Sequence, residues 1–174
     1  LHELLFTQGS FIKGTQVILS GGIICLMYHL GQRLSGRTGA RWAAWLYALS
    51  PTMIFFSQSL WSECIYGGML LLALYFFIRS VDESPKRYEW AGMVGLTVGL
   101  CVLFRGVATY MLPIFCFALL WRRFRQAQAW KQVAVLCFSA VLTIAPYSLY
   151  ASQKFGATIV SDRTLGQMMW LGNN

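Results

Sequence analysis

Glu63 is a single carboxylate between two long apolar segments, which makes it a candidate for chemistry at a membrane surface. The chain is apolar up to Phe56, turns polar at Ser57-Gln-Ser59, and becomes apolar again from Cys64 to Ile78. A carboxylate is costly in a hydrocarbon layer, so its presence there is by default a functional hypothesis. The alternative interpretation is a hairpin tip at the membrane surface, where Glu63 is simply hydrated.

Arg105 is the second charged residue that apolar segments enclose, in Leu103-Phe-Arg-Gly106. The turn predicted there is too short to form a loop of its own. A guanidinium binds oxyanions such as phosphate through two parallel hydrogen bonds, so Arg105 is a candidate phosphate ligand. The alternative is an arginine that extends its charged end to lipid headgroups, as long basic side chains at helix ends do.

The segment 161–174 is polar, contains glycines, and carries Trp170 and Asn173. An aromatic ring beside amide groups offers a sugar both an apolar face and hydrogen bonds, so these two residues are candidate substrate contacts. A surface loop anchored by one buried tryptophan explains the same residues.

The composition indicates an integral membrane protein. Of the 174 residues, 57% are hydrophobic and 11% are charged, whereas soluble domains carry about 25% charged residues. The net charge of +8 does not indicate nucleic-acid binding, because the basic residues lie in short segments between apolar runs and form no nucleic-acid-binding motif. The five cysteines have no metal-ligand spacing.

We predict an all-α integral membrane protein with about six transmembrane helices, part of a larger multi-span bundle with an outer-face tail. Residues 1–14 are expected to be the end of an outer-face loop or an interfacial helix, 15–150 the transmembrane domain, and 151–174 an outer-face loop. Each apolar segment is close to the ~20 residues that cross a bilayer. The segments are 15–31, 42–57, 61–78, 90–104, 107–121 and 132–150.

Ten of the 14 basic residues fall in alternate connections between these segments. Because cytoplasmic loops carry an excess of Lys and Arg, these connections are predicted to be cytoplasmic. Glu63, Arg105 and the tail then share the opposite, outer face. The ten residues are Arg33, Arg37, Arg41, Arg79, Lys86, Arg87, Arg122, Arg123, Arg125 and Lys131.

Several short motifs, in this order, resemble the polytopic glycosyltransferases of the glycosyltransferase-C superfamily. The likeness is to the protein O-mannosyltransferases and the lipid A aminoarabinose transferases, and it covers nearly the whole chain. The motifs are the basic segment 31–40 leading to Leu49-Ser-Pro51, Ser62-Glu63, the glycine-rich run 95–105, Ala145-Pro-Tyr147 with Phe155-Gly156, and Trp170-Leu-Gly-Asn-Asn174. The chain departs from the pattern at Gly106, where a proline is usual, at Tyr147, and at Tyr150-Ala151.

The resemblance implies a transferase that moves a sugar from a polyprenyl-phosphate donor to a lipid, glycan or protein acceptor at the outer face, in bacteria the periplasmic face of the inner membrane. Its general base is expected in an outer loop upstream of Leu1, so the chain is interpreted as a fragment without its catalytic acid. Glu63 then orients sugar or acceptor, ligates a divalent metal, or pairs with Arg105. The alternative is a non-catalytic membrane protein, such as a transporter half or an assembly subunit. The sugar, the acceptor and metal dependence stay open.

Overall fold

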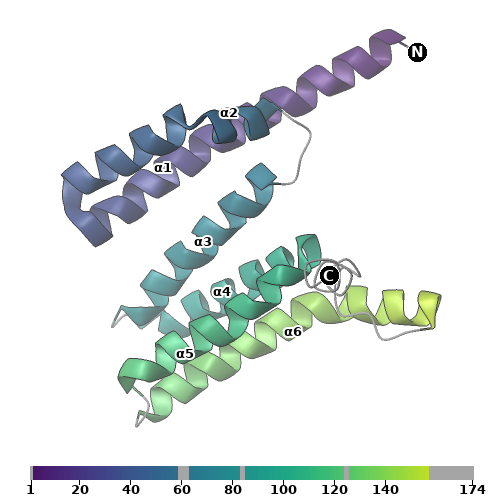
Figure 1. The fold of residues 1–174 in the computed structure, drawn as a ribbon. Coiled ribbons are helices and arrows are strands. Elements are labelled where there is room, and N and C mark those ends of the chain that lie inside the picture. The colour runs from purple at the N-terminus through teal and green to yellow at the C-terminus, as the bar shows by residue number, and fades with distance from the viewer. Residues whose placement is uncertain (1, 59–62, 83–84, 124–125, 157–174) are drawn as a thin grey trace, which may run out of the picture. The chain divides into compact units, whose positions relative to one another are not determined.

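The computed structural model describes residues 2–58, 63–82, 85–123 and 126–156. All the regular secondary structure in these ranges is helical (Figure 1), as predicted for an all-α membrane protein. The elements are α1 (His2–Leu49), α2 (Pro51–Gln58), α3 (Glu63–Val81), α4 (Arg87–Phe104), the 3-10 helix η1 (Gly106–Tyr110), α5 (Met111–Arg123) and α6 (Ala127–Phe155).

Within the described ranges, three helices are long and apolar enough to cross a membrane: residues 14–49, 63–81 and 127–154. A shorter apolar helical stretch covers residues 106–121. The helix α4 has 18 residues, but Arg87 and Glu89 in its first turn make it more polar. The chain is therefore an all-α integral membrane protein, and six spans remain a prediction.

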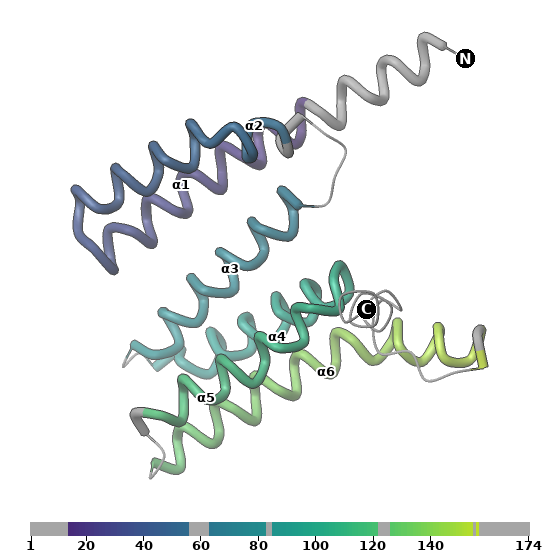
Figure 2. Tube along the Cα trace, in the orientation of Figure 1, coloured from purple at the N-terminus to yellow at the C-terminus, as the bar shows by residue number. Residues whose placement is uncertain are grey.

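The chain divides into two compact units, Leu1–Leu71 and Leu72–Asn174, with the division inside α3. In the first unit, α1 contains two helical arms that meet at Gly36 (φ 72°, ψ −177°). Figure 2 shows the trace reversing direction within α1. The prediction of a basic loop was wrong, because residues 31–41 are helical on both sides of a one-residue break.

Small residues allow the two arms of α1 to approach each other beside this break. A Cβ atom added at Gly31 would lie 2.8 Å from the Cα of Ala40. The backbone at Gly36 lies in a region that is essentially restricted to glycine. The run Gly31–Ala40, which the sequence singles out as a family motif, therefore has a structural explanation as a helical hairpin.

In the second unit, α4 and α6 pack against each other through glycine. A Cβ atom added at Gly99 would lie 2.8 Å from the Cβ of Thr143 and 3.1 Å from the carbonyl oxygen of Ala140. One added at Gly95 would overlap Ser139 and the Leu136 carbonyl, whereas at Gly92 it would make an ordinary 3.6 Å contact with Val135. Gly95 and Gly99 therefore allow the two helices to pack closely, whereas Gly92 has room for a side chain.

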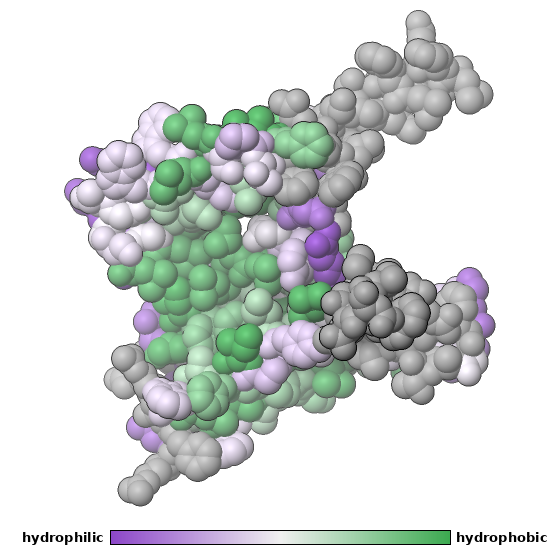
Figure 3. Space-filling model, viewed as in Figure 1, coloured by the Kyte–Doolittle hydropathy of each residue, from purple (hydrophilic) through white to green (hydrophobic). Residues whose placement is uncertain are grey.

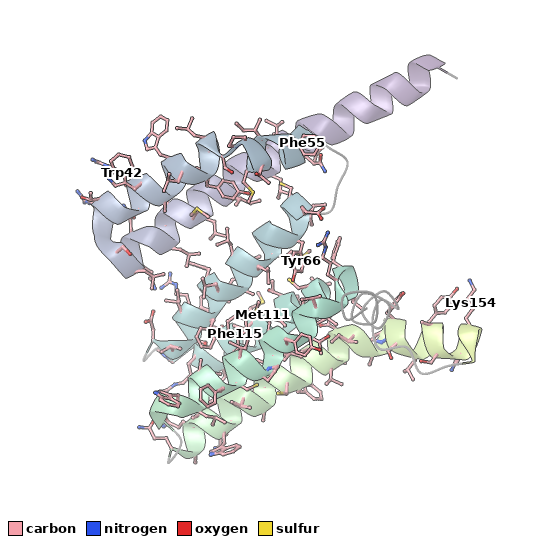
Figure 4. The ribbon with its side chains drawn as sticks, viewed as in Figure 1. Trp42, Phe55, Tyr66, Met111, Phe115 and Lys154 are labelled. Atoms are coloured by element: carbon pink, nitrogen blue, oxygen red, sulfur yellow. The ribbon has the colours of Figure 1, made fainter. Side chains whose placement is uncertain are left out.

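The core of the second unit is mainly aliphatic and includes an aromatic pair. Val94, Val98, Val102 and Leu136 are fully buried. Phe77 of α3 stacks on Phe115 of α5 with ring centroids 4.8 Å apart; Phe115 is labelled in Figure 4. Much of the visible outer surface of this unit is apolar (Figure 3), and large side chains of α6 such as Phe138 are 70% exposed. A surface of this kind faces lipid or further helices in a membrane protein.

A buried polar contact joins the end of α3 to α6. The side chain of Gln132 is 2% exposed and donates from Nε2 to the carbonyl oxygen of Ser80 at 2.9 Å. Nearby, the guanidinium of Arg79 lies over the rings of Tyr75 and Trp90, 5.6 and 5.8 Å from their centroids. The last turn of α3 is therefore held by both a hydrogen bond and cation–π contacts.

The predicted boundary between residues 14 and 15 falls inside α1, and other predicted boundaries shift by a few residues. The segment 42–57 is divided at Ser50, where α1 ends and Pro51 begins α2. A proline fits the first position of a helix because its missing N–H has no partner there. The helix α6 continues past Ala151 to Phe155 and ends at Gly156, which has a left-handed conformation. The predicted tail therefore begins inside a helix.

Candidate functional site

Glu63 is the first residue of α3, where a carboxylate interacts favourably with the positive end of the helix dipole. Its side chain is half-buried. The next residue, Cys64, is 6% exposed and its Sγ lies 3.3 Å from the Oγ of Ser20 in α1. Glu63 thus stands beside a polar contact between two helices of the first unit, not on a fully solvated tip.

Gln16 and Ser20 of α1 belong to the same polar group, although the sequence did not single them out. The Oγ of Ser20 donates to the carbonyl oxygen of Gln16 at 3.0 Å, and the Gln16 side chain is 6% exposed. Their spacing of four places both residues on one helical face. A polar pair at i and i+4 within an otherwise apolar stretch is the sequence signal that identifies them. The group formed by Gln16, Ser20, Glu63 and Cys64 is called the Glu63 cluster below.

Arg105 occupies a one-residue junction in the second unit. The helix α4 ends at Phe104, Arg105 has extended backbone angles (φ −147°, ψ 121°), and η1 begins at Gly106. Its N–H donates to the carbonyl oxygen of Cys101 at 2.8 Å, and its own carbonyl oxygen accepts from the N–H of Ala108 at 3.0 Å. The predicted tight turn is confirmed, and the backbone of Arg105 is held on both sides.

The Arg105 side chain is exposed at this junction. Its neighbours Phe104 and Val107 are 42% and 59% exposed, while Gly106 and Ala108 are buried. A guanidinium is therefore presented from a fixed backbone, between apolar side chains that suit the hydrocarbon region. Such a group can bind an oxyanion at the boundary between lipid and water.

Glu63 and Arg105 belong to different units, so their suggested pairing stays a prediction. Trp170 and Asn173 lie outside the described residues, and their predicted role in substrate binding also stays a prediction. Among the described residues, no group of three or more His, Cys, Asp or Glu side chains is arranged to hold a metal ion.

The fold and these polar groups define the class as a helical integral membrane protein with charged residues at helix ends. Residues 5–149 match the model of the family described as dolichyl-phosphate-mannose-protein mannosyltransferase. The chain belongs to this family, and the membership points to a membrane glycosyltransferase. Searches of curated proteins and of solved structures returned no match. The Glu63 cluster and Arg105 both lie within the matched residues.

Proposed function

We propose that the chain is part of a glycosyltransferase that takes a sugar from a polyprenyl phosphate and transfers it to an acceptor at the outer face of the membrane. The observation that carries the proposal is the exposed guanidinium of Arg105 on a fixed junction between two apolar helical segments, inside the family match. In the proposal, the outer face is the face opposite the connections that hold ten of the basic residues, and in a bacterium this is the periplasmic face of the inner membrane.

In the proposed reaction, an acceptor oxygen attacks the anomeric carbon of the sugar. The bond between that carbon and the phosphate oxygen breaks, and its electron pair stays on the polyprenyl phosphate. The acceptor proton goes to a general base of the enzyme. Negative charge increases on the departing phosphate, so a fixed cation there stabilises the transition state more than the ground state. Arg105 is the residue proposed for this role.

Glu63 is proposed to orient the sugar or the acceptor. A carboxylate accepts hydrogen bonds from hydroxyl groups, and the half-buried position of Glu63 beside Cys64 limits its freedom. The alternative role is stabilisation of the first turn of α3, worth about 0.3–1 kcal/mol for an exposed charge at a helix N-terminus. The acceptor class, whether lipid, glycan or protein, is not specified by these residues.

The Arg105 proposal is tested by Arg105→Ala in the full-length protein, reconstituted with a polyprenyl-phosphate-linked sugar. Loss of one charge-stabilising group in an active site lowers kcat by about 10²–10³-fold, and we expect an effect of that size. Arg105→Lys should recover part of it, because the charge remains while the bidentate geometry is lost.

The matched control is Lys154→Ala. Lys154 is an exposed cation near the end of α6 (Figure 4), with Nζ 3.5 Å from the Tyr150 hydroxyl. Its removal should change kcat by less than about twofold, since a surface contact of this kind contributes little. Arg105→Ala with unchanged donor affinity and turnover would exclude the proposed role.

For Glu63 the informative variant is Glu63→Gln, which keeps the shape of the side chain and removes its charge. We expect a reduced kcat/KM for transfer, with a helical content equal to that of the unmodified protein. Unchanged transfer activity would return Glu63 to a purely structural role at the start of α3.

A further inference from the structure

The returning arm of α1 carries an open groove that the proposed transfer reaction does not use. It has a volume of about 500 Å³ and is lined by Thr38, Arg41, Trp42, Trp45 and Leu49. These residues occupy positions i, i+3, i+4, i+7 and i+11, so they follow one face of the helix. A basic residue therefore stands near one end of the groove, two indole rings in the middle, and an aliphatic side chain at the other end.

The apolar part of the groove is open to the surroundings. Trp42, Trp45 and Leu49 are 67%, 62% and 65% exposed, and Trp42 is labelled on this arm in Figure 4. From Arg41 to Leu49 the helix rises about 12 Å at 1.5 Å per residue. That length suits the upper part of a lipid acyl chain, and tryptophan is the side chain enriched at the level where lipid headgroups meet hydrocarbon.

The charge at the basic end of the groove favours an anionic ligand. Arg33, Arg37 and Arg41 fall within nine residues around the Gly36 break, and all three are exposed. No Asp or Glu occurs between Glu3 and Glu63 in the sequence, so the field of these arginines is not offset by acidic residues within this stretch. A basic residue near the membrane surface attracts an anionic lipid by about 1 kcal/mol, and this attraction falls with distance, so Arg41, which lines the groove, is expected to contribute most.

We propose that this groove binds one anionic phospholipid, with its phosphate at Arg41 and an acyl chain along Trp42, Trp45 and Leu49. The guanidinium supplies the charge-assisted hydrogen bonds to the phosphate, and the indoles supply a rigid apolar wall. The site is independent of the proposed transfer reaction, because its residues are separate from Arg105 and the Glu63 cluster and its test does not use activity.

The test is native mass spectrometry of the full-length protein in detergent, with added phosphatidylglycerol or phosphatidylcholine of identical acyl chains. We expect the unmodified protein to retain phosphatidylglycerol at least about fivefold more strongly, as one charge near a surface predicts. Equal retention of the two lipids would overturn the proposal.

The variant Arg41→Gln should remove most of that preference, whereas Arg33→Gln should reduce it by less than about twofold. Arg33 is the matched control, because it is an exposed arginine near the same break and does not line the groove. Equal losses in both variants would indicate a diffuse basic surface and overturn the assignment of a site. Thermal unfolding of both variants near that of the unmodified protein shows that folding is intact.

A third variant, Trp45→Leu, tests the apolar wall and should weaken retention of both lipids while keeping the preference for the anionic one.

Two further outcomes would overturn the proposal. In the first, an equimolar amount of polyprenyl phosphate displaces phosphatidylglycerol from the unmodified protein but not from Arg41→Gln. That result would assign the groove to the donor lipid. The second is a dimer that disappears in Trp45→Leu, which would mean that a second copy covers the groove.

Discussion

The α4–α6 pair and the α1 hairpin both bring helices together through small residues, but they leave different surfaces behind. In the pair, Gly95 and Gly99 face backbone and side-chain atoms of α6, and Val94, Val98 and Val102 are fully buried beside them. In the hairpin, the close approaches at Gly31, toward Ala40, and at Gly39, toward Ser35, both lie next to the break. Beyond it, the returning arm exposes Trp42, Trp45 and Leu49.

The α4–α6 pair therefore holds helices together, whereas the α1 hairpin leaves a surface that can bind lipid. Without a hydrophobic driving force between helices in a bilayer, tight packing of small residues provides the attraction. The α4–α6 pair has that packing at Gly95 and Gly99, from the middle of α4 toward the Arg105 junction at its end. The hairpin has it only near its break, so one face of its second arm stays open for a ligand.

The largest expected effect is that of Gly95→Leu in the second unit. A Cβ atom at this position already overlaps the Leu136 carbonyl and Ser139, so the two helices must separate. We expect a loss of about 3 kcal/mol, at the upper end of overpacking effects, measured as a lower midpoint of unfolding in detergent.

Gly92→Ala is the control for Gly95→Leu, since its new Cβ atom meets Val135 at an ordinary 3.6 Å. Its effect should stay within about 0.5 kcal/mol. In Gly95→Leu, the preference of the α1 groove for anionic phospholipid should persist wherever the protein remains folded. Equal stability of the two variants would mean that α4 and α6 do not approach as closely as described.

A smaller effect is expected for Gly36→Ala in the first unit. The backbone at this position has φ 72° and ψ −177°, a conformation that costs other residues about 1–3 kcal/mol. We expect a loss of about 2 kcal/mol and a weaker preference for phosphatidylglycerol, because the arms of the hairpin shift. Thermal unfolding and native mass spectrometry measure the two effects.

Gly21→Ala is the comparison for Gly36→Ala, because Gly21 lies in the interior of the same helix with nothing within 4 Å of an added Cβ. Alanine is favoured there by about 0.5–1 kcal/mol. A destabilisation by Gly21→Ala as large as that by Gly36→Ala would contradict the assignment of Gly36 as the break.

The smallest of the three effects is expected for Gln132→Leu. The change removes the buried hydrogen bond to the Ser80 carbonyl and leaves that carbonyl without its partner, at a cost of about 1–2 kcal/mol. Gln128→Leu is the control, because Gln128 is exposed and accepts a hydrogen bond from the side chain of Arg87 at 2.7 Å. If the two variants unfold at the same midpoint, the Ser80–Gln132 contact does not stabilise the second unit.

The sequence alone was sufficient for the class of protein and for its family. The low charge and long apolar segments are properties of composition, and they require a membrane environment whatever the packing. The family followed from motifs read in order along the chain, and residues 5–149 match its model. The tight junction at Arg105 was also predictable, because Arg105-Gly106 stands directly between two apolar runs.

Only the tertiary structure decided which residues meet. Ser20 and Cys64 are 44 positions apart, and Ser80 and Gln132 are 52 apart, so no local pattern selects either pair. The apparent basic loop became a hairpin because Gly36 alone leaves the helical conformation. The glycines looked alike in the sequence, but the neighbouring helix decides that Gly95 is crowded and Gly92 is not. Composition and spacing act locally, whereas close packing depends on partners that the chain brings together only on folding.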